Sequence, residues 1–400
     1  MLGQLTLAYF LAQGVRQVYS SSLPEIKSAF AASGLSDADL GLVGSAFALV
    51  YGLAMPLSGL AADFFRRKAI VVAGVLLFSL GIFAVGFAQN LSMLVAAFGV
   101  ANALGQALFA PATTSLIGQH HVETRGTAFS VYQAGVYAGT VVCGTVAGLF
   151  AGAGGDVWRW GFWTFGAAGV VWALVLAGRL EDTPPVMSEG AERPSVAVAL
   201  SAVVKCPTAL LLMLALGFYF YALFGVKTWL PAYLRTAYPG VSAESAAFHG
   251  VIWFYLGSFA GVFAGGRLSD RFRARRRAVR LETNLLGLLG AAPFLLAIAF
   301  APNYPLCAAA SGLFGLACGF YDSNLYATLM DVVDVRYRAA AVGVFGCGGC
   351  VLGSLGPLAI GWMGEHLTRT AGFVSMAGAA AAGAALLFAA RLFTFERDVR

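Results

Sequence analysis

The sequence predicts an all-α membrane protein whose twelve transmembrane helices form two six-helix bundles. Of the 400 residues, 59% are hydrophobic and only 11% are charged, whereas a soluble domain carries about 25% charged residues. Apolar runs of about 18 residues or more, long enough to cross a hydrocarbon core about 30 Å thick, recur from end to end. Related motifs appear in both halves of the chain, which predicts a repeated bundle.

Hydropathy windows, broken at Gly, Pro and charged positions, place the helices in order. In the first half we expect them at 4–29, 39–61, 69–88, 92–118, 126–151 and 158–179. In the second half we expect them at 205–234, 246–267, 279–299, 304–330, 338–363 and 370–392. Gly356-Pro357 predicts a hinge or kink in the eleventh helix.

A polar segment divides the chain nearly in half. It contains LEDTPPVMSEGAERPS, which is rich in Pro, Glu and Ser and is typical of a linker. We therefore expect an N-terminal bundle at 1–179, a cytoplasmic linker at 180–204 and a C-terminal bundle at 205–400.

The basic residues predict the orientation, because Lys and Arg accumulate in cytoplasmic loops. With the N-terminus inside, most of them fall on the cytoplasmic side. The outer side holds only Lys27, Arg159, Lys227, Arg235 and Arg369. This asymmetry predicts a multi-pass protein of the inner membrane with both termini in the cytoplasm.

The loop after the second helix of each half carries the repeat most clearly, as GLAADFFRRK (59–68) and GRLSDRFRAR (266–275). Its pattern of Gly, Asp and Arg resembles the signature loop of the major facilitator superfamily. The resemblance implies the major facilitator fold, with Asp63, Arg67, Asp270 and Arg275 as gating residues that latch the two halves in one state.

The first helix is similar to that of the anion:cation symporters and the organophosphate:phosphate antiporters. In YFLAQGVRQVYSSSLPEI an Arg, here Arg16, lies eight residues before a Pro. The chain departs from those branches at three positions: Leu223 replaces a second Arg, Val136 a helix-five His, and Gln106 a helix-four Glu. The resemblance therefore implies an organic-anion transporter without a paired-Arg phosphate clamp.

Arg16 lies near the middle of the first predicted span, where a charged side chain costs roughly 2.5–3.5 kcal/mol or more. A helical projection places polar residues within an arc of about 100° around it. They are Thr6, Tyr9, Gln13, Gln17 and Ser20. A polar face of this kind predicts a water-filled cavity in which the guanidinium grips a carboxylate through two parallel bonds. The alternative is a structural Arg paired with an acid or with helix-end carbonyls.

Asp322, in GFYDSNLYA, lies deep in the tenth predicted helix. A carboxyl in a low-dielectric site can take up and release protons, so Asp322 is the candidate for ion coupling. It could instead be the resting counter-ion of Arg16, or bond structurally to a neighbouring helix.

Polar and aromatic side chains in four other helices complete the expected substrate site. Lys227 could attract anions into an outward-open cavity, or could simply extend its ammonium group to the membrane interface. The expected substrate-binding set is Tyr9, Gln13, Arg16, Gln17, Gln106, Tyr132, Gln133, Tyr137, Tyr221, Lys227 and Asn324. Asn102 and Tyr219 could line the same cavity.

The sequence contains no arrangement typical of an enzyme. Cys347-Gly-Gly-Cys350 has metal-like spacing, but no second ligand pair accompanies it, none of the four histidines pairs with a Cys/Asp cluster at ligand spacing, and no nucleophile–base set can be placed, so we expect no cofactor and no metal. The favoured hypothesis is a monomeric secondary transporter of a small organic anion such as a sugar acid, driven by protons, with Na⁺ as the other candidate ion. The alternatives are a carrier of a neutral sugar or lipid-like amphiphile, with Arg16 and Asp322 paired as an internal gate, and a non-transporting sensor.

Overall fold

The computed structural model describes residues 1–121, 123–181 and 196–399, without the side chains at 59–64, 125, 196, 197, 199 and 339. Within these residues the regular structure is entirely helical. The chain divides into two compact units. Unit 1 comprises Met1–Ala191 with Lys227–Val251, and unit 2 comprises Glu192–Val226 with Ile252–Arg400. Most of the expected linker at 180–204 lies outside the described residues, and the bundle boundaries at 179 and 205 stay a prediction.

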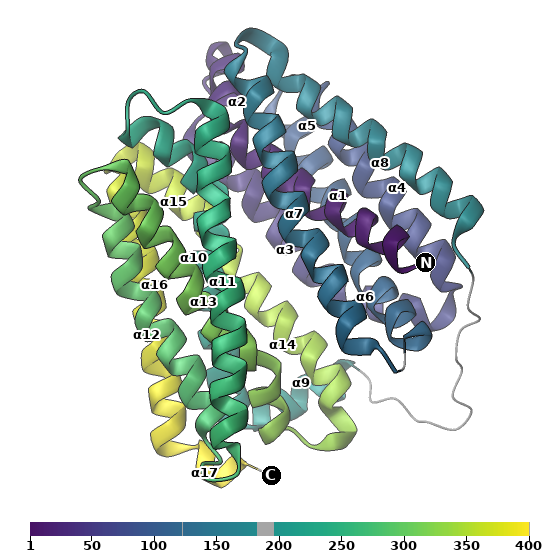
Figure 1. Cartoon of the computed structure of the whole chain (residues 1–400), viewed down its shortest axis with the longest axis vertical. Coiled ribbons are helices and arrows are strands. Elements are labelled where there is room, and N and C mark those ends of the chain that lie inside the picture. Colours follow the sequence, from purple (N-terminus) through teal and green to yellow (C-terminus); the bar gives the residue numbers. More distant parts are fainter. Residues whose placement is uncertain (122, 182–195, 400) are drawn as a thin grey trace. The chain divides into compact units, whose positions relative to one another are not determined.

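Unit 1 is built from long helices that lie side by side, as the purple and blue ribbons of Figure 1 show. The helices that form single elements are α1 (Leu2–Ser21), α2 (Leu23–Ala29), α3 (Asp37–Phe64), α4 (Arg67–Val85), α7 (Arg125–Gly152) and α8 (Arg159–Arg179). The fourth span consists of three consecutive elements, α5 (Leu91–Leu94), η2 (Val95–Asn102) and α6 (Ala103–His120). Short 3₁₀ turns are η1 (Ala31–Ser33) and η3 (Gly155–Trp158). The η2 segment is a π-helix. Its wider backbone is rare and occurs frequently at functional sites.

Glycines let α1 and α7 approach closely, as small residues do in membrane helix pairs. A Cβ atom added to Gly139 would lie 2.1 Å from the carbonyl oxygen of Phe10, and one added to Gly135 would lie 2.8 Å from Thr6 Cγ2. The backbones are in direct contact there, so the side chains of α1 keep a fixed direction relative to α7.

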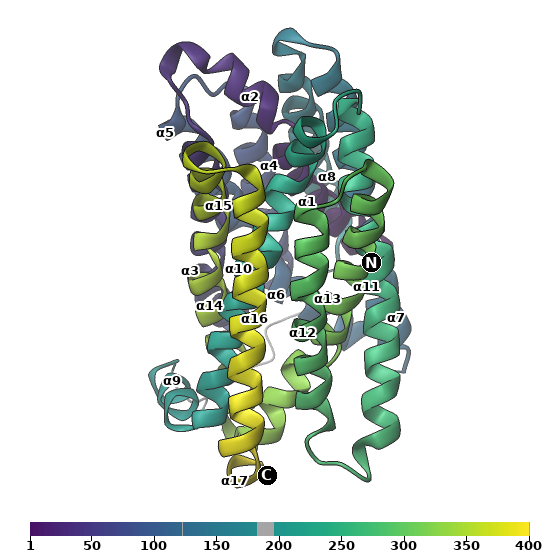
Figure 2. The same cartoon turned by 90° about the vertical axis from the view of Figure 1, so that its left-hand side faces the viewer.

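Unit 2 repeats the arrangement, and in Figure 2 its helices α12, α13 and α16 lie next to one another. Its elements are α9 (Val196–Lys205), α10 (Pro207–Ala237), α11 (Ala243–Arg273), α12 (Val279–Ala299), α13 (Tyr304–Val332), η4 (Val335–Tyr337), α14 (Arg338–Gly353), α15 (Leu355–His366), α16 (Arg369–Phe393) and α17 (Phe395–Asp398). The C-terminal part of α10 and the N-terminal part of α11 (Lys227–Val251) belong to unit 1.

The same cap starts the fourth span of each half. Asn90 accepts a hydrogen bond from the backbone N–H of Met93 at 2.9 Å, and Asn303 accepts one from Leu306 at 3.1 Å. An Asn at this position satisfies a backbone donor that the helix itself leaves unpaired. The repeat recognised in the sequence therefore extends to helix capping.

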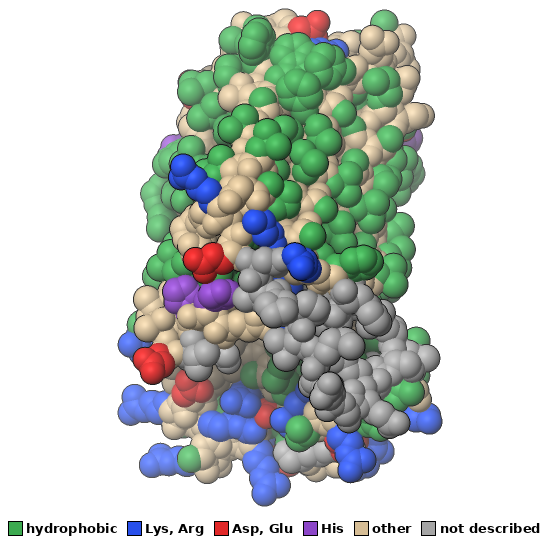
Figure 3. Space-filling view, turned by 90° about the vertical axis from the view of Figure 1, so that its right-hand side faces the viewer, with side chains coloured by type: hydrophobic (Ala, Val, Ile, Leu, Met, Phe, Trp, Pro, Cys, Tyr) green, Lys and Arg blue, Asp and Glu red, His purple; other side chains and the backbone are tan. Residues whose placement is uncertain are grey.

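Eleven helices in the described part of the chain are long and apolar enough to cross a membrane. Helix α1, with its polar stripe, does not meet that criterion. The eleventh expected span is interrupted at Ser354, beside Gly356-Pro357, which confirms the predicted break. Helix α9 was not predicted, since its residues were assigned to the linker. On the face drawn in Figure 3, hydrophobic side chains form a broad belt and basic side chains gather at one end.

Candidate functional site

Arg16 lies on α1 with its guanidinium directed toward α3 and α6 of unit 1. Its Nε atom donates a hydrogen bond of 2.7 Å to Oε1 of Gln106. Its Cζ atom lies 4.5 Å from the centre of the Phe47 ring and 4.9 Å from that of Tyr51, which is cation–π distance. Its Nη2 atom is buried without a hydrogen-bond partner among the described residues. No described carboxylate forms an ion pair with Arg16, so its charge is held by neutral groups.

Gln106 is itself held by a second amide. Its Nε2 atom donates a 2.8 Å bond to Oδ1 of Asn102, one helical turn earlier on the same span. Asn102 is fully buried and Gln106 is 2% exposed. Asn102 is the last residue of the π-helix η2, so this unusual backbone leads directly into the site. The (i, i+4) spacing of the two amides was visible in the sequence, but its connection to Arg16 was not.

The polar stripe predicted on α1 does not face a single cavity. Gln17 is buried, and a Cβ atom added to Gly144 of α7 would lie 2.5 Å from Gln17 Cγ, so this side chain is directed toward α7. Ser20 donates to the carbonyl oxygens of Lys227 and Thr228, both at 2.7 Å. Gln13 is partly buried. Of the stripe, the structure brings Arg16 to Gln106, while Gln17 and Ser20 make other contacts.

Tyr9 and Tyr132 form an aromatic pair between α1 and α7. Their rings stack with centroids 4.2 Å apart, and the Tyr132 hydroxyl hydrogen-bonds with Thr113 at 2.7 Å. Tyr137 is partly buried, and Gln133 is exposed on the surface of unit 1. The structure therefore brings together two of the expected tyrosines but places Gln133 away from them.

The candidate coupling carboxylate lies in unit 2. Asp322 on α13 is exposed within this unit and is close enough to Tyr219 and Tyr321 to act on both electrostatically. The two tyrosine rings are 4.4 Å apart. Tyr221 forms a 3.2 Å hydrogen bond with Ser375, and Asn324 donates to Ser323 Oγ at 2.8 Å. Asp322 thus lies beside an aromatic pair, Tyr219 and Tyr321, in its own unit.

One group of ion pairs in unit 2 centres on a residue that sequence reasoning missed. Asp331, at the end of α13, accepts from Arg273 at 2.8 Å and from Arg280 at 2.9 Å. Asp270 and Arg275, the expected gating pair, are both exposed, and no ion pair joins either to another described residue.

The corresponding loop of unit 1 is only partly described. The side chain of Asp63 lies outside the described residues. Arg67 is 7% exposed, and its Nε and Nη1 atoms lack hydrogen-bond partners among the described residues.

Unit 1 contains a further group of ionic contacts around α2. Glu25 of α2 pairs with Arg235 of α10, and Lys27 pairs with Asp37 at 2.8 Å. A cavity of about 650 Å³ lies beside the first pair and is also lined by Asp156. No pattern in the sequence predicts these pairings, since the partners Glu25 and Arg235 are separated by 210 positions.

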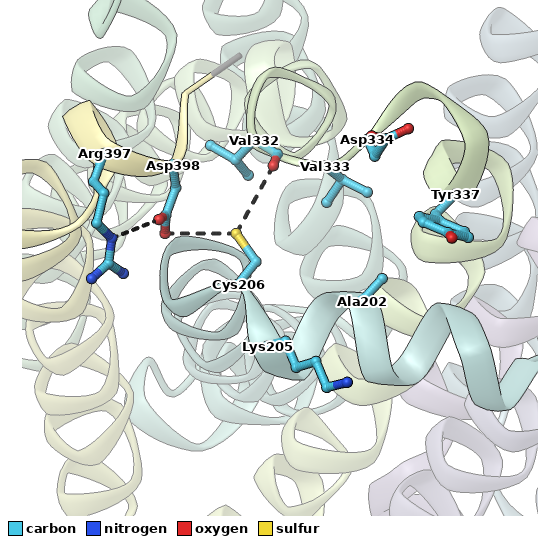
Figure 4. A pocket seen from close by; sticks show the side chains of 9 residues that line it. All are labelled: Ala202, Lys205, Cys206, Val332, Val333, Asp334, Tyr337, Arg397 and Asp398. Atoms are coloured by element: carbon cyan, nitrogen blue, oxygen red, sulfur yellow. Dashed lines mark hydrogen bonds and ion pairs between the residues drawn. The ribbon is translucent and has the colours of Figure 1, made fainter.

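A smaller cavity of about 360 Å³ lies between α9, α13 and the C-terminal turn of unit 2 (Figure 4). On its wall, Asp398 accepts hydrogen bonds from the backbone N–H of Thr208 at 3.0 Å and from its hydroxyl at 2.9 Å. Burial opposes ionisation of Asp398, but the bonds from Thr208 and Arg397 prevail and hold its pKa below the usual range. Burial raises the pKa of the adjacent Cys206 thiol, so this cysteine is not an activated nucleophile.

Membrane-length helices in two related halves are typical of a membrane transporter. The family comparison gives the same class. The chain belongs to the Major Facilitator Superfamily, whose family model matches residues 5–282 and, in a second match, 240–398. It is therefore a multi-pass membrane protein and a secondary transporter.

Curated relatives include carriers of organic anions. The chain is 26% identical over 387 residues to a probable sulfoacetate transporter of Cupriavidus necator, covering 92% of this chain and 87% of the relative. It is 24% identical over 349 residues to a chloroplastic ascorbate transporter of Arabidopsis thaliana, covering 82% and 63%. It is 28% identical over 321 residues to a 3-(3-hydroxy-phenyl)propionate transporter of Escherichia coli, covering 79% and 75%.

Solved structures show the same fold. A bacterial homologue of the human lysosomal transporter Spinster, in an inward-facing and unoccupied conformation, superposes with a TM-score of 0.84 at 24% identity, covering 100% of this chain and 98% of the other. The nucleoside transporter NupG superposes with a TM-score of 0.78 at 15% identity, covering 97% and 99%.

Proposed function

We propose that this protein carries a small organic anion across the inner membrane by alternating access, and that Arg16 binds the carboxylate or sulfonate group of the ligand. One observation supports this most directly: the guanidinium has no acidic partner among the described residues, and its buried Nη2 donor is unsatisfied. A buried donor without a partner costs about 1–3 kcal/mol, and more when charged. An anion that binds Nη2 would remove this cost and neutralise the charge.

The ligands named for the relatives support the same substrate class. Sulfoacetate, ascorbate and 3-(3-hydroxy-phenyl)propionate are all organic anions of low molecular weight. We propose Tyr9, Gln13, Tyr132 and Tyr137 as further lining residues of unit 1, with Lys227 on α10, and leave out Gln17 because it is directed toward α7. In unit 2 we propose Tyr221 and Asn324 as lining residues and Asp322 as the proton carrier.

The experiment is uptake of labelled sulfoacetate into proteoliposomes that contain the purified protein. Arg16→Ala and Arg16→Lys should both lose uptake, because Lys cannot reproduce the planar guanidinium fork. Arg267→Lys is the matched control, since Arg267 also lies over an aromatic ring, that of Phe263, but is exposed. Wild-type uptake by Arg16→Ala would reject the site.

Competition tests the charge of the ligand separately. A carboxylate should inhibit uptake strongly, and the alcohol of the same skeleton should not, if the site requires an anion. Equal inhibition by both would favour the neutral-ligand alternative.

The remaining proposals concern orientation, gating and assembly. The basic residues support cytoplasmic termini. We propose Asp63 with Arg67, and Asp270 with Arg275, as gating residues that pair in another state of the transport cycle. We also propose that the protein works as a monomer of two bundles, 1–179 and 205–400.

A further inference from the structure

We infer that Gln106, anchored by Asn102 at the end of the π-helix, is a positioning residue that occupies one edge of the Arg16 guanidinium and directs the other toward the ligand. The inference rests on the proposed function for the identity of the ligand. The contact geometry within unit 1 carries the rest.

The polarity of the hydrogen-bond chain follows from the donor inventory of its members. Arginine has five N–H donors and no acceptor. Gln106 must therefore direct its oxygen to Arg16 Nε, which leaves its NH₂ group for Asn102 Oδ1. The NH₂ group of Asn102 is then left over, and its Nδ2 atom is indeed buried without a hydrogen-bond partner among the described residues. The chain thus has one orientation.

That orientation determines which edge of the guanidinium remains for a ligand. The Nε donor of Arg16 is already hydrogen-bonded to Gln106, and the Phe47 and Tyr51 rings contact the guanidinium carbon. The unsatisfied donor is Nη2, at the end of the side chain. A ligand with two oxygens on one atom, such as a carboxylate or sulfonate, can bridge this end with two parallel bonds.

The backbone that carries the two amides is held rigidly. A Cβ atom added to Gly81 of α4 would lie 2.8 Å from the backbone nitrogen of Asn102. One added to Gly105 would lie 2.3 Å from the nitrogen of Phe78, and one added to Gly99 would lie 2.9 Å from Ala46 Cβ on α3. The π-helical span is thus in close contact with α3 and α4, so Gln106 presents a fixed acceptor rather than a mobile one.

Gln106→Glu tests the contact without a ligand. The new carboxylate would pair with Arg16, whose Nε atom contacts this position, and the titratable ring of Tyr51 lies 4.9 Å from the guanidinium carbon, with Tyr9 and Tyr132 also close to this cluster. We expect a higher melting temperature than wild type at neutral pH, and loss of this gain in acid as the new carboxyl is protonated. Gln89→Glu, in an exposed loop of unit 1, is the matched control. If both variants melt alike at both pH values, the inference is overturned.

Sulfoacetate uptake by Gln106→Glu tests the consequence for the ligand. Uptake should be lost at neutral pH, because the carboxylate competes with the anion, and should recover on acidification. If wild type does not take up sulfoacetate but the melting shift of Gln106→Glu persists, the proposed ligand is wrong and the positioning contact stands. Uptake by this variant that equals wild type at neutral pH would overturn the inference.

Gln106→Met and Asn102→Ala separate positioning from folding. We expect Gln106→Met to raise the KM for sulfoacetate about tenfold, the effect of one hydrogen bond to a charged group, with Vmax nearly unchanged. The Gln106→Met/Asn102→Ala double variant should have the same KM as Gln106→Met alone, because both residues act through one chain of hydrogen bonds. A fall in Vmax at constant KM, or additive effects on KM, would show a structural role instead and contradict the inference.

Discussion

Arg16 carries a charge on a half-buried side chain of helix α1, and its neighbours explain how the folded chain accommodates it. A hydrogen bond to the side-chain amide of Gln106 and two aromatic rings stabilise the guanidinium without cancelling its charge. A carboxylate in the place of Gln106 would form an ion pair and compete with an anionic ligand. The neutral environment is therefore suited to reversible anion binding.

The ring of Phe47 should contribute to this binding, because a cation over an aromatic face gains about 0.5–2 kcal/mol. Phe47→Leu keeps most of the volume but removes the ring. We expect the KM for sulfoacetate to rise roughly fivefold with the fold intact, measured by uptake and by thermal melting. Phe388→Leu, at an exposed position of α16, should leave KM unchanged. An unchanged KM in Phe47→Leu would show that the ring only fills space.

At the scale of elements, short segments orient the long helices. The C-terminal turn α17 is an example, because Asp398 binds the first residues of α10 through Thr208. A carboxylate at a helix N-terminus satisfies backbone donors and interacts favourably with the helix dipole. The turn therefore attaches the end of α16 to the start of α10 within unit 2.

Asp398→Asn should destabilise the protein by about 1 kcal/mol at neutral pH, the usual value of a cap. Because the pKa of Asp398 is lowered in the folded state, the stabilisation is complete above the unfolded-state pKa and is lost as the pH falls through the folded-state value. Melting of wild type and variant across this range measures the difference, which should vanish in acid. Glu396→Gln, an exposed neighbour, should show little effect at any pH. A pH-independent difference for Asp398→Asn would contradict the assignment.

At the scale of the whole molecule, accumulating a ligand against its own gradient would require ligand binding to be coupled to an ion gradient. Asp322 is our candidate carrier, and it lies with Tyr219 and Tyr321 in unit 2. A carboxyl in such surroundings can hold a proton at one stage of the cycle and release it at another.

Asp322→Asn should abolish accumulation of sulfoacetate driven by a proton gradient, because the side chain can no longer release a proton. Exchange of labelled for unlabelled sulfoacetate across the same membrane should persist, since it needs no net proton movement. Both are measured in proteoliposomes, with Glu365→Gln at an exposed position as the control. Normal uphill accumulation by Asp322→Asn would assign coupling to another group.

The family, the all-helical membrane fold and the interrupted eleventh span could be predicted from the sequence. Hydropathy, Gly-Pro pairs and motif repeats are local properties of the chain, so they do not depend on how the helices are arranged in space. Helix α9 was missed because a ten-residue helix beside a polar linker has no membrane-length signal. The π-helix was missed because its sequence, VAAFGVAN, is as apolar as a regular span.

By itself, the sequence determined that a membrane transporter of this family carries a cation, Arg16, within its first helix. Only the tertiary structure decided that Gln106, ninety positions away, holds that cation, and that Gln17, its immediate neighbour, is directed toward α7. The physical reason is that hydropathy is set residue by residue, whereas the partner of a buried side chain depends on how closely two helices approach. In unit 1 that approach is set by glycines such as Gly105 and Gly139. Their contacts are with other helices, so a projection of a single helix does not show them.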